Sequence, residues 1–362
     1  MKKPVQILVL NSGSTSLKYK LLDFGLKEIK SGFIEEIGKE KIKNHTEALK
    51  SALSKIGEIK NIKYVGHRVV HGGNKFYHPT IVDKKTLKEI EKFNHLAPLH
   101  NPPNLQGVEA SINLIKNAVN VAVFDTAFYK HIPEHAFLYA IPKELYRKYG
   151  IRKYGFHGIS HNYVMLEAAK MLKKPANKLR LITCHLGGGA SITAIKNGQA
   201  IDTSMGFTPM EGLAMASRCG DIDPGVVIEL IRNKNIKIKK YTEGDRVDDV
   251  NYLLNRESGL KGLAEINSDS IYEISHMAAH GDEEMMNVLR FYAYRIKKYI
   301  GAYRAVLGKV DAVVFTGTVG YRSGRIKRLI VSGFKDMKDI KTLVIKTDEE
   351  LMIAKEIVRM FK

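Results

Sequence analysis

Residues 5–22 read VQILVLNSGSTSLKYKLL and hold the pattern that decides the fold. A buried-strand run, Val5–Leu10, leads into the polar turn Asn11–Ser14, and a second strand follows at Ser16–Leu22. The tip of this hairpin is small, hydroxylated and rich in backbone N–H, which suits phosphate because bare amides can approach its oxygens closely. An ordinary tight hairpin is the alternative, but it would need no serine or lysine beside the glycine.

The same plan returns later in the chain. The run Leu179–Cys184 leads into His185, Leu186 and the glycines at 187–189, and a second strand follows at Ser191–Ile195. A third strand-to-glycine junction occupies Val310–Gly320. Two matching hairpins, almost half a chain apart, favour a chain built from two related halves.

Helical patterns lie between these strands. His161–Lys174 is amphipathic and is expected to end at Pro175, whose ring forbids continuation. Glu284–Leu307 carries apolar residues at spacings of three and four, which indicates a helix packed on a core. We expect Thr347 to cap the last helix and Glu350 to reach back in a capping box. Strands that alternate with helices predict the α/β class.

Length and composition favour a two-domain enzyme. The chain has 362 residues, 44% of them hydrophobic, which is long for one compact core. No apolar run is long enough for a transmembrane helix, and the run after the N-terminal lysines is too short for a signal peptide. The cysteines are Cys184 and Cys219 alone, which excludes a disulfide framework and predicts a reduced, cytoplasmic protein.

The net charge of +20 raises the possibility of nucleic-acid binding. The lysines are spread along the whole chain, with only short clusters such as Ile236–Lys240. No zinc-finger spacing, RNP-like aromatic motif or basic heptad region accompanies them. We therefore interpret the charge as solvated faces whose positive field would attract anionic substrates, and expect neither a nucleic-acid nor a membrane partner.

Several segments are dense in polar residues that a hydrophobic core would not choose. Each has a plain structural explanation: a buried histidine, an aspartate at a turn, or an ion pair between Arg218 and Asp221. A metal site through His157 and His161 is conceivable, but Gly158 and the lack of a nearby carboxylate argue against it. Loops on a rigid scaffold are where catalytic residues gather. The candidates are Arg68 in HRVVHGG, His100 in LAPLHNPPN, Asp125 in VAVFDTAF, His157 and His161 in KYGFHGISH, and Arg218 in SRCGDIDP.

Taken together, these blocks resemble the acetate kinase family. The matching segments run in family order along most of the chain: NSGSTSLKYKLLD, HRVVHGG, LAPLHNPPNLQGVEA, VFDTAF, YGFHGISH, CHLGGGASI, DTSMGFTPMEGL, RCGDIDP and TDEELMIAKE. The resemblance implies two duplicated ribonuclease H-like domains, the acetate and sugar kinase/actin-like fold, flanking a cleft. It implies an N-terminal domain at 1–130, completed by the C-terminal helix 348–362, a C-terminal nucleotide-binding domain at 131–347, and a homodimer.

The resemblance also implies a role for each matching residue. Asn11, Ser14, Ser16 and Lys18 would handle donor phosphates, and Asn11 and Glu349 would lie at Mg²⁺, with Mn²⁺ possible. Arg68 would hold the acceptor carboxylate in a pocket of Val70, Leu99, Phe156 and Pro209. Asp125, His157 and Arg218 would form the catalytic core with Arg68, supported by His100 and His161. His185, Leu186, Gly187, Gly188 and Gly189 would follow the nucleotide phosphates, and Asp269, Thr318, Val319, Gly320, Tyr321 and Arg322 would lie at the adenosine.

The departures from the family pattern all fall on the nucleotide side. Gly188 stands where the family has Asn, and Ile271 stands where an Arg is expected near the adenine. The segment 318–322 reads Thr-Val-Gly-Tyr-Arg in place of Gly-Ile-Gly-Glu-Asn, and the stretch from Gly320 to Thr342 is short. The expected activity is reversible, Mg²⁺-dependent transfer between ATP and acetate, giving acetyl phosphate and ADP. A propionate or butyrate kinase, a pyrophosphate-using or other non-ATP enzyme, and a weakly active sensor remain as alternatives.

Overall fold

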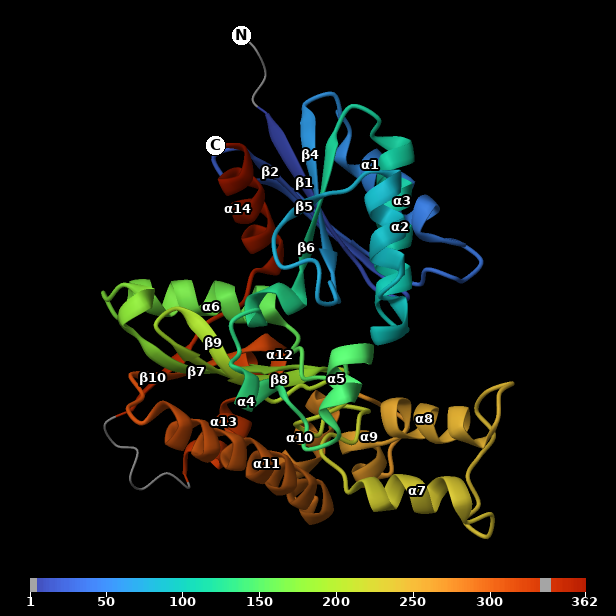
Figure 1. Ribbon diagram of the computed structural model, residues 1–362, viewed down its shortest axis with the longest axis vertical. Coiled ribbons are helices and arrows are strands. Elements are labelled where there is room, and N and C mark those ends of the chain that lie inside the picture. The colour runs from blue at the N-terminus through green and yellow to red at the C-terminus, as the bar shows by residue number, and fades with distance from the viewer. Residues whose placement is uncertain (1–4, 333–339) are drawn as a thin grey trace. The chain divides into compact units, whose positions relative to one another are not determined.

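A computed structural model describes residues 5–332 and 340–362 and divides the chain into two compact units (Figure 1). The first unit comprises the chain up to Lys130, residues 156–163 and Asp348–Lys362. The second comprises His131–Gly155 and Val164–Thr347. The short segment 156–163 therefore groups with the first unit, although its sequence position alone suggested the second.

The first unit is a six-stranded sheet in the order β3-β2-β1-β4-β6-β5. Strands β1, β2 and β3 run antiparallel as a meander, while β4 and β6 extend the sheet in parallel beside β1. Its elements are β1 Gln6–Ser12, β2 Leu17–Asp23, β3 Glu28–Ile34, α1 His45–Ile56, β4 Ile62–Val69, β5 Thr80–Ile81, α2 Lys84–Glu91, α3 Asn101–Leu114, β6 Val119–Phe124 and α14 Glu349–Phe361.

Helices cover both faces of this sheet (Figure 1). Helices α1 and α3 pack on one another and on the sheet, and α14 packs on β1 and β4. Burial on both faces explains why β1 reads as a continuous apolar run, since Ile7–Leu10 is at most 1% exposed. Gly66 of β4 lets α14 approach, because a Cβ there would lie 2.6 Å from a methyl of Ile353.

The second unit repeats this plan. Its sheet has the order β11-β10-β7-β8-β9, in which β7, β8 and β9 form the antiparallel meander and β10 and β11 extend it in parallel beside β7. Strand for strand this matches β6-β4-β1-β2-β3, so the expected duplication of a ribonuclease H-like fold is confirmed. The strands are β7 Arg180–Leu186, β8 Ala190–Lys196, β9 Gln199–Thr203, β10 Ala312–Thr316 and β11 Lys341–Val344.

One long helix, α11 (Glu283–Leu307), packs on the sheet of the second unit through β7 and β8. It buries the stripe that its apolar spacing predicted, and begins at Asp282, which accepts a hydrogen bond from the Met285 amide. The remaining helices are α4 Glu134–Phe137, α5 Lys143–Tyr149, α6 Gly158–Met171, α7 Pro224–Arg232, α8 Arg246–Arg256, α9 Gly259–Ala264, α10 Ile271–Ala279, α12 Gly317–Arg322 and α13 Gly324–Val331.

Two expected helix boundaries were wrong. The α6 helix starts at Gly158, before His161, and ends at Met171. At α14 the N-cap is Asp348, whose side chain accepts from the Leu351 amide, whereas Thr347 was expected there. Glu350 forms no capping box; its carboxylate is fully buried and accepts from Lys18. Among the helices of the described residues, none is long and apolar enough to cross a membrane.

Candidate active site

A partly buried ion pair between Arg68 and Asp125 lies at the centre of the first unit's polar cluster. Arg68 is near the end of β4, and Asp125 directly follows β6, the neighbouring parallel strand. The guanidinium donates to Asp125 Oδ2 through Nη2 at 2.6 Å and through Nε at 3.0 Å. Parallel strands deliver their carboxyl ends to one edge of a sheet, which explains how residues 57 positions apart meet here.

The charges around this pair keep Arg68 protonated. Burial alone would lower the pKa of Arg68, but the carboxylates of Asp125, Glu349 and Glu350 raise it above its ordinary value. Burial raises the pKa of Asp125, Arg68 opposes that rise, and Glu349 adds to it. Glu349 therefore acts electrostatically on both members of the pair. Asp125 Oδ1 is buried and makes no hydrogen bond to any residue that the structure describes, so it retains capacity to accept one.

The ends of β1 and β2 that flank their connecting turn are tied to the start of α14. Lys18 donates to the Glu350 carboxylate at 2.7 Å, and Asn11 Nδ2 makes a longer contact of 3.4 Å with the same group. On its other side Asn11 Oδ1 accepts from Arg68 Nη1 at 3.4 Å. Asn11 thus joins the proposed phosphate turn to the proposed acceptor arginine. The sequence predicted Asn11, Lys18 and Glu349 at this place, but missed Glu350.

His157 has an unusual backbone conformation, with φ of 58°, in the left-handed region. Such a conformation is strained for a residue with a side chain and often accompanies function. The next residue, Gly158, fits against Asp125, since a Cβ there would lie 2.0 Å from the Asp125 carbonyl oxygen. His161 is fully buried one helical turn further on, and its amide donates to the His157 carbonyl at 3.0 Å. The segment therefore presents His157 at the Asp125 end of β6.

The proposed acceptor wall is only partly formed within the first unit. Val70 and Phe156 are buried, at 3% and 1% exposure, and the rings of His71 and Phe156 meet edge to face. The Val70 amide donates to Asn104 Oδ1 at 3.0 Å, which fixes the backbone after Arg68. Leu99, in contrast, is 42% exposed, and His100 is half-buried at the start of α3. Pro209 belongs to the second unit.

The second unit carries the other glycine turn, at 187–189. The Gly187 amide donates to the Gly189 carbonyl at 3.0 Å, which closes the turn between β7 and β8. A Cβ on Gly187 would lie 3.3 Å from the hydroxyl of Thr318, so this turn lies beside the start of α12. Gly188 at the tip faces open space, because a Cβ there would meet no atom within 4 Å.

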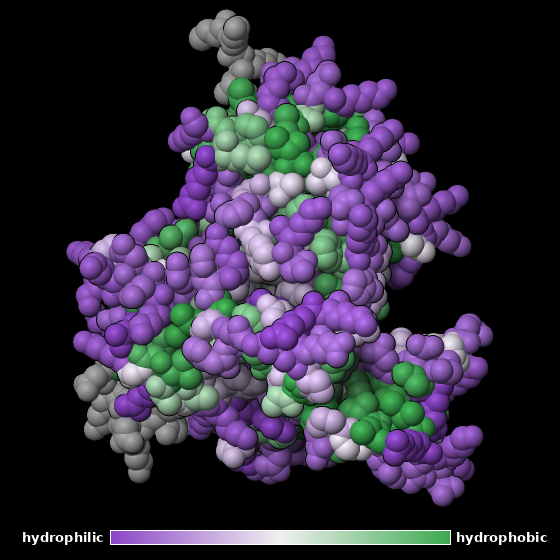
Figure 2. Space-filling model, in the orientation of Figure 1, coloured by the Kyte–Doolittle hydropathy of each residue, from purple (hydrophilic) through white to green (hydrophobic). Residues whose placement is uncertain are grey.

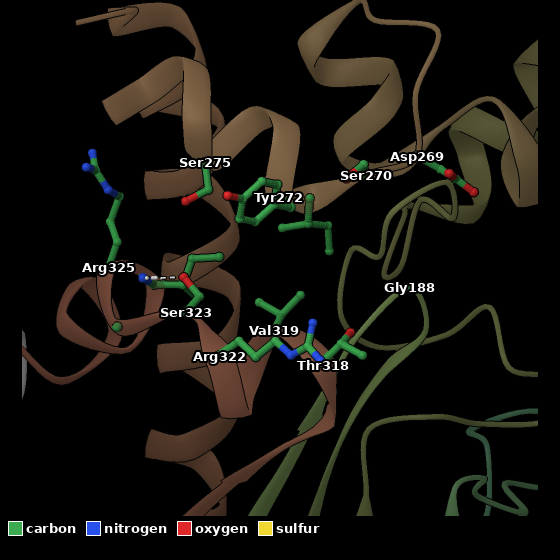
Figure 3. Close-up of a pocket in the computed structure, with 13 residues that line it drawn as sticks. Gly188, Asp269, Ser270, Tyr272, Ser275, Thr318, Val319, Arg322, Ser323 and Arg325 are labelled. Atoms are coloured by element: carbon green, nitrogen blue, oxygen red, sulfur yellow. Dashed lines mark hydrogen bonds between the residues drawn. The ribbon is translucent and has the colours of Figure 1, made fainter. Parts of the chain in front are cut away.

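A pocket of about 500 Å³ opens beside this turn (Figure 3). Of the residues expected at the adenosine, Asp269, Thr318, Val319 and Arg322 line it, together with Gly188 and the substituted Ile271. Gly320 and Tyr321 do not line it; Gly320 is buried against Leu186 and Tyr321 is exposed. The sequence missed the rest of the lining, which comes from α10, α13 and their N-cap residues: Ser270, Tyr272, Ser275, Ser323, Gly324, Arg325 and Ile326.

Arg218 occupies a largely apolar loop of the second unit. Its guanidinium donates to the Pro209 carbonyl at 3.3 Å and contacts the Met215 sulfur at 3.7 Å. Burial, and then the positive charge of Arg256, lower its pKa to about 10. The Asp221 carboxylate accepts from the Tyr299 hydroxyl and from the Gly212 amide. A cation in such surroundings would be stabilised by an anionic ligand.

The residues of the first unit suit magnesium better than a tightly binding metal. Mg²⁺ uses one or two carboxylates, keeps several waters and binds substrate phosphates. Asn11 and Glu349, with the free Oδ1 of Asp125 nearby in the same cluster, offer only oxygen donors of this kind. Within the described residues no group of three or more His, Cys, Asp or Glu could hold a metal.

Comparison with known proteins identifies the family. A family model described as the acetokinase family matches residues 38–338. The chain belongs to the acetokinase family. An acetate kinase of Clostridium novyi is 42% identical over 400 aligned positions, covering 97% of each chain. The structure of Porphyromonas gingivalis acetate kinase superposes with a TM-score of 0.89 at 36% identity, covering 99% of this chain and 100% of that one. A propionate kinase from Francisella tularensis gives the same TM-score at 34% identity, covering 97% and 98%.

These matches cover the length of both partners, so the acetokinase family fold accounts for the duplicated sheets. They include enzymes named for two acceptors that differ by one methylene. The choice between these acceptors therefore depends on the residues of this chain's own acceptor site.

Proposed function

We propose that this chain is an acetate kinase that transfers the terminal phosphoryl group of a nucleoside triphosphate to acetate. The partly buried Arg68, kept charged by the buried carboxylate of Asp125, is the observation that carries the proposal. A carboxylate acceptor is an anion, with a reference pKa of roughly four, and must meet a second anion, the donor phosphate. A cation that stays protonated while partly shielded from water is what such an acceptor needs.

The chemistry requires charge compensation more than proton removal. Acetate is already ionised near neutral pH, so no general base is needed, and one carboxylate oxygen attacks the γ-phosphorus while the bond to the β-phosphate oxygen breaks. Negative charge spreads over the transferred group in this in-line transition state. We propose that Arg218 and His157 stabilise that charge and that Arg68 binds the acceptor carboxylate. His100 and His161 would have supporting roles. Asp125 then orients Arg68 instead of acting as a base.

We assign Mg²⁺, or Mn²⁺ in its place, to Asn11 and Glu349. A bound divalent ion would neutralise the donor phosphates. Ser14, Ser16 and Lys18 would hold the same phosphates from the β1–β2 turn. Glu350 supports this assignment indirectly, because its contacts with Asn11 and Lys18 fix both side chains.

The acceptor is proposed to be acetate, with propionate as the second candidate. Val70 and Phe156 are buried and bulky, which favours a small acyl group, and Leu99 and Pro209 would complete the wall. One methylene in such a pocket is worth about 1–3 kcal/mol, so discrimination against propionate would be limited.

The donor is proposed to be ATP, bound with its base in the pocket beside Gly188. The pocket volume of about 500 Å³ is ample for a nucleoside. Its chemistry, however, departs from the family pattern: Ile271 replaces an expected Arg, and the Arg322 guanidinium, which only donates, lines the wall. Tyr272 and Arg322 approach the pocket from different helices (Figure 3). We therefore propose a relaxed choice of nucleotide, with pyrophosphate use as its extreme form.

A homodimer is proposed from an uncovered apolar helix. No residue of α7 is buried, although the helix reads PGVVIELIR, and Val226 and Ile228 are 44% and 48% exposed. Val247 and Tyr252 of α8 are also exposed, and Figure 2 shows hydrophobic residues gathered over α7 and α8. A second copy would cover this surface. The two free thiols, Cys184 and Cys219, fit the cytoplasm.

The decisive experiment is an acceptor and donor panel with purified protein. Acyl phosphate formation would be followed with Mg²⁺, ATP and either acetate, propionate or butyrate, and then with GTP, CTP or pyrophosphate at saturating acetate. We expect acetate-dependent turnover that EDTA abolishes and that GTP partly supports. Turnover that no carboxylate stimulates would refute the proposed function. A strong preference for ATP over every other donor would refute only the relaxed nucleotide choice.

A further inference from the structure

We propose that His45 is a positioning residue that aims the backbone amide of Ser14 at the donor phosphate. The inference rests on the proposed function of the β1–β2 turn. His45 is the first residue of α1, is only 4% exposed, and places its Nε2 2.8 Å from the carbonyl oxygen of Gly13. A carbonyl oxygen can only accept a hydrogen bond, so Nε2 must carry a proton and donate it.

Hydrogen bonds fix the two successive peptide units of the turn between Ser12 and Ser14. In the unit between Ser12 and Gly13, the Ser12 carbonyl accepts from the Asn104 side chain and the Gly13 amide donates to the Ser16 carbonyl at 2.8 Å. In the unit between Gly13 and Ser14, the Gly13 carbonyl accepts from His45. The Ser14 amide makes no hydrogen bond with the rest of the described chain. It is the one polar group of the two peptide units left available to a ligand.

The peptide geometry connects His45 to that amide. A trans peptide unit is planar, and its C=O and N–H point in opposite directions. When His45 fixes the direction of the Gly13 carbonyl, it also fixes the Ser14 N–H, pointing away from α1. Phosphate is bound by backbone amides held in this manner. Without His45 the unit could rotate about its flanking bonds, and the amide would lose its direction while the strands stayed paired.

Helix capping does not explain His45. The α1 helix is capped by Asn44, whose side chain accepts from the Glu47 amide at 3.0 Å. Ala48, Leu49 and Ala52 already supply the buried face of the helix. A buried imidazole at this position therefore has its one identified hydrogen bond directed at the turn, which is the role that we assign to it.

The test compares His45→Leu, which removes the donor, with His45→Gln, whose amide nitrogen can replace Nε2. Leu49→Ala is the control, because it weakens the same helix without contact to Gly13. For each variant one would measure the melting temperature, the dissociation constant of ATP by calorimetry without acetate, and the KM values for ATP and acetate. We expect His45→Leu to raise the dissociation constant of ATP by about tenfold or more, which is the size of effect expected when a hydrogen bond to a charged group is lost. The KM for acetate should stay unchanged. His45→Gln should recover most of the affinity.

The inference is overturned if His45→Leu only lowers the melting temperature, as Leu49→Ala should, or if it raises both KM values equally. It is also overturned if His45→Gln binds ATP as weakly as His45→Leu does. The calorimetric measurement tests the role of His45 separately from the proposed function. A parent protein that binds ATP but phosphorylates no carboxylate would refute the proposed function and leave the comparison of His45 variants interpretable.

Discussion

At the scale of single residues, the two arginines have opposite surroundings. Arg68 faces carboxylates, and its pKa is raised by Asp125 and Glu349 against the effect of burial. Arg218 has its pKa lowered to about 10 by burial and by a second cation. The protein itself stabilises the charged form of Arg68, whereas a bound substrate anion would stabilise the charged form of Arg218. This difference predicts separate kinetic effects when each is removed.

Arg218→Ala should lower kcat by about a thousandfold, because a cation that stabilises a phosphoryl transition state is worth that much. Arg68→Ala should instead mainly raise the KM for acetate. Steady-state kinetics with Mg-ATP would measure both. Arg290→Ala is the control, since Arg290 contacts Glu283 and Asn287 at the surface and its loss should change neither constant. Near-normal turnover of Arg218→Ala would contradict the assignment.

Val70→Ala should shift the acceptor preference from acetate toward propionate and butyrate. Val70 is buried beside Arg68, and its truncation would open space for about one methylene, worth about 1–3 kcal/mol in such a pocket. The ratio of kcat/KM for propionate to that for acetate should rise at least tenfold. An unchanged ratio would move the acyl pocket away from Val70.

His67 should make the fold sensitive to acid. It is buried and bonded to Asn120, and burial lowers its pKa to about 4. In the unfolded chain this histidine has its ordinary pKa of 6.5, so between pH 6.5 and 4 the unfolded chain binds more protons than the folded chain. The free energy of unfolding should therefore fall as pH drops from 6.5 toward 4. The loss would be about 3 kcal/mol. Urea titrations of the parent and His67→Gln across this window should show a shallower pH dependence in the variant; equal slopes would contradict it.

At the scale of elements, the errors of sequence reasoning arise where a distant partner decides. Thr347 and Glu350 have the spacing of a capping box, but Lys18, 332 positions away, takes the Glu350 carboxylate and Asp348 takes the cap. The lining from α10 and α13 could not be predicted either, because it depends on both helices packing against α11. Strand runs and the α11 stripe were predicted because local apolar spacing determines them.

The α7 helix gives a prediction at this scale. Val226→Asp combined with Ile228→Asp should convert the proposed dimer into a monomer, since both side chains are exposed in the single chain and would be buried by a second copy. Sedimentation velocity would measure the mass, and circular dichroism would show that the fold persists. Tyr294→Asp, at another exposed apolar position, is the matched control. A parent protein that is already monomeric would refute the proposed interface.

At the scale of the whole molecule, the duplication was visible in the two hairpins, and the strand orders of the sheets confirm it. The candidate site was predicted less completely. Arg68, Asp125, Asn11 and Glu349 lie close together within one unit, because β4 and β6 end where α14 begins. Glu350, His45 and most of the base pocket were missed, since their roles depend on contacts between segments far apart in sequence.

The central claim is that a carboxylate oxygen of acetate attacks the γ-phosphorus of the donor. The most direct measurement is phosphorus NMR of the reaction with ¹⁸O-labelled acetate, Mg²⁺ and ATP. We expect acetyl phosphate to form in equal amount with ADP and to carry ¹⁸O in the bridge between carbon and phosphorus, at a rate that Arg218→Ala strongly reduces. Release of inorganic phosphate without acetyl phosphate, or acetyl phosphate with no label in the bridge, would contradict the account.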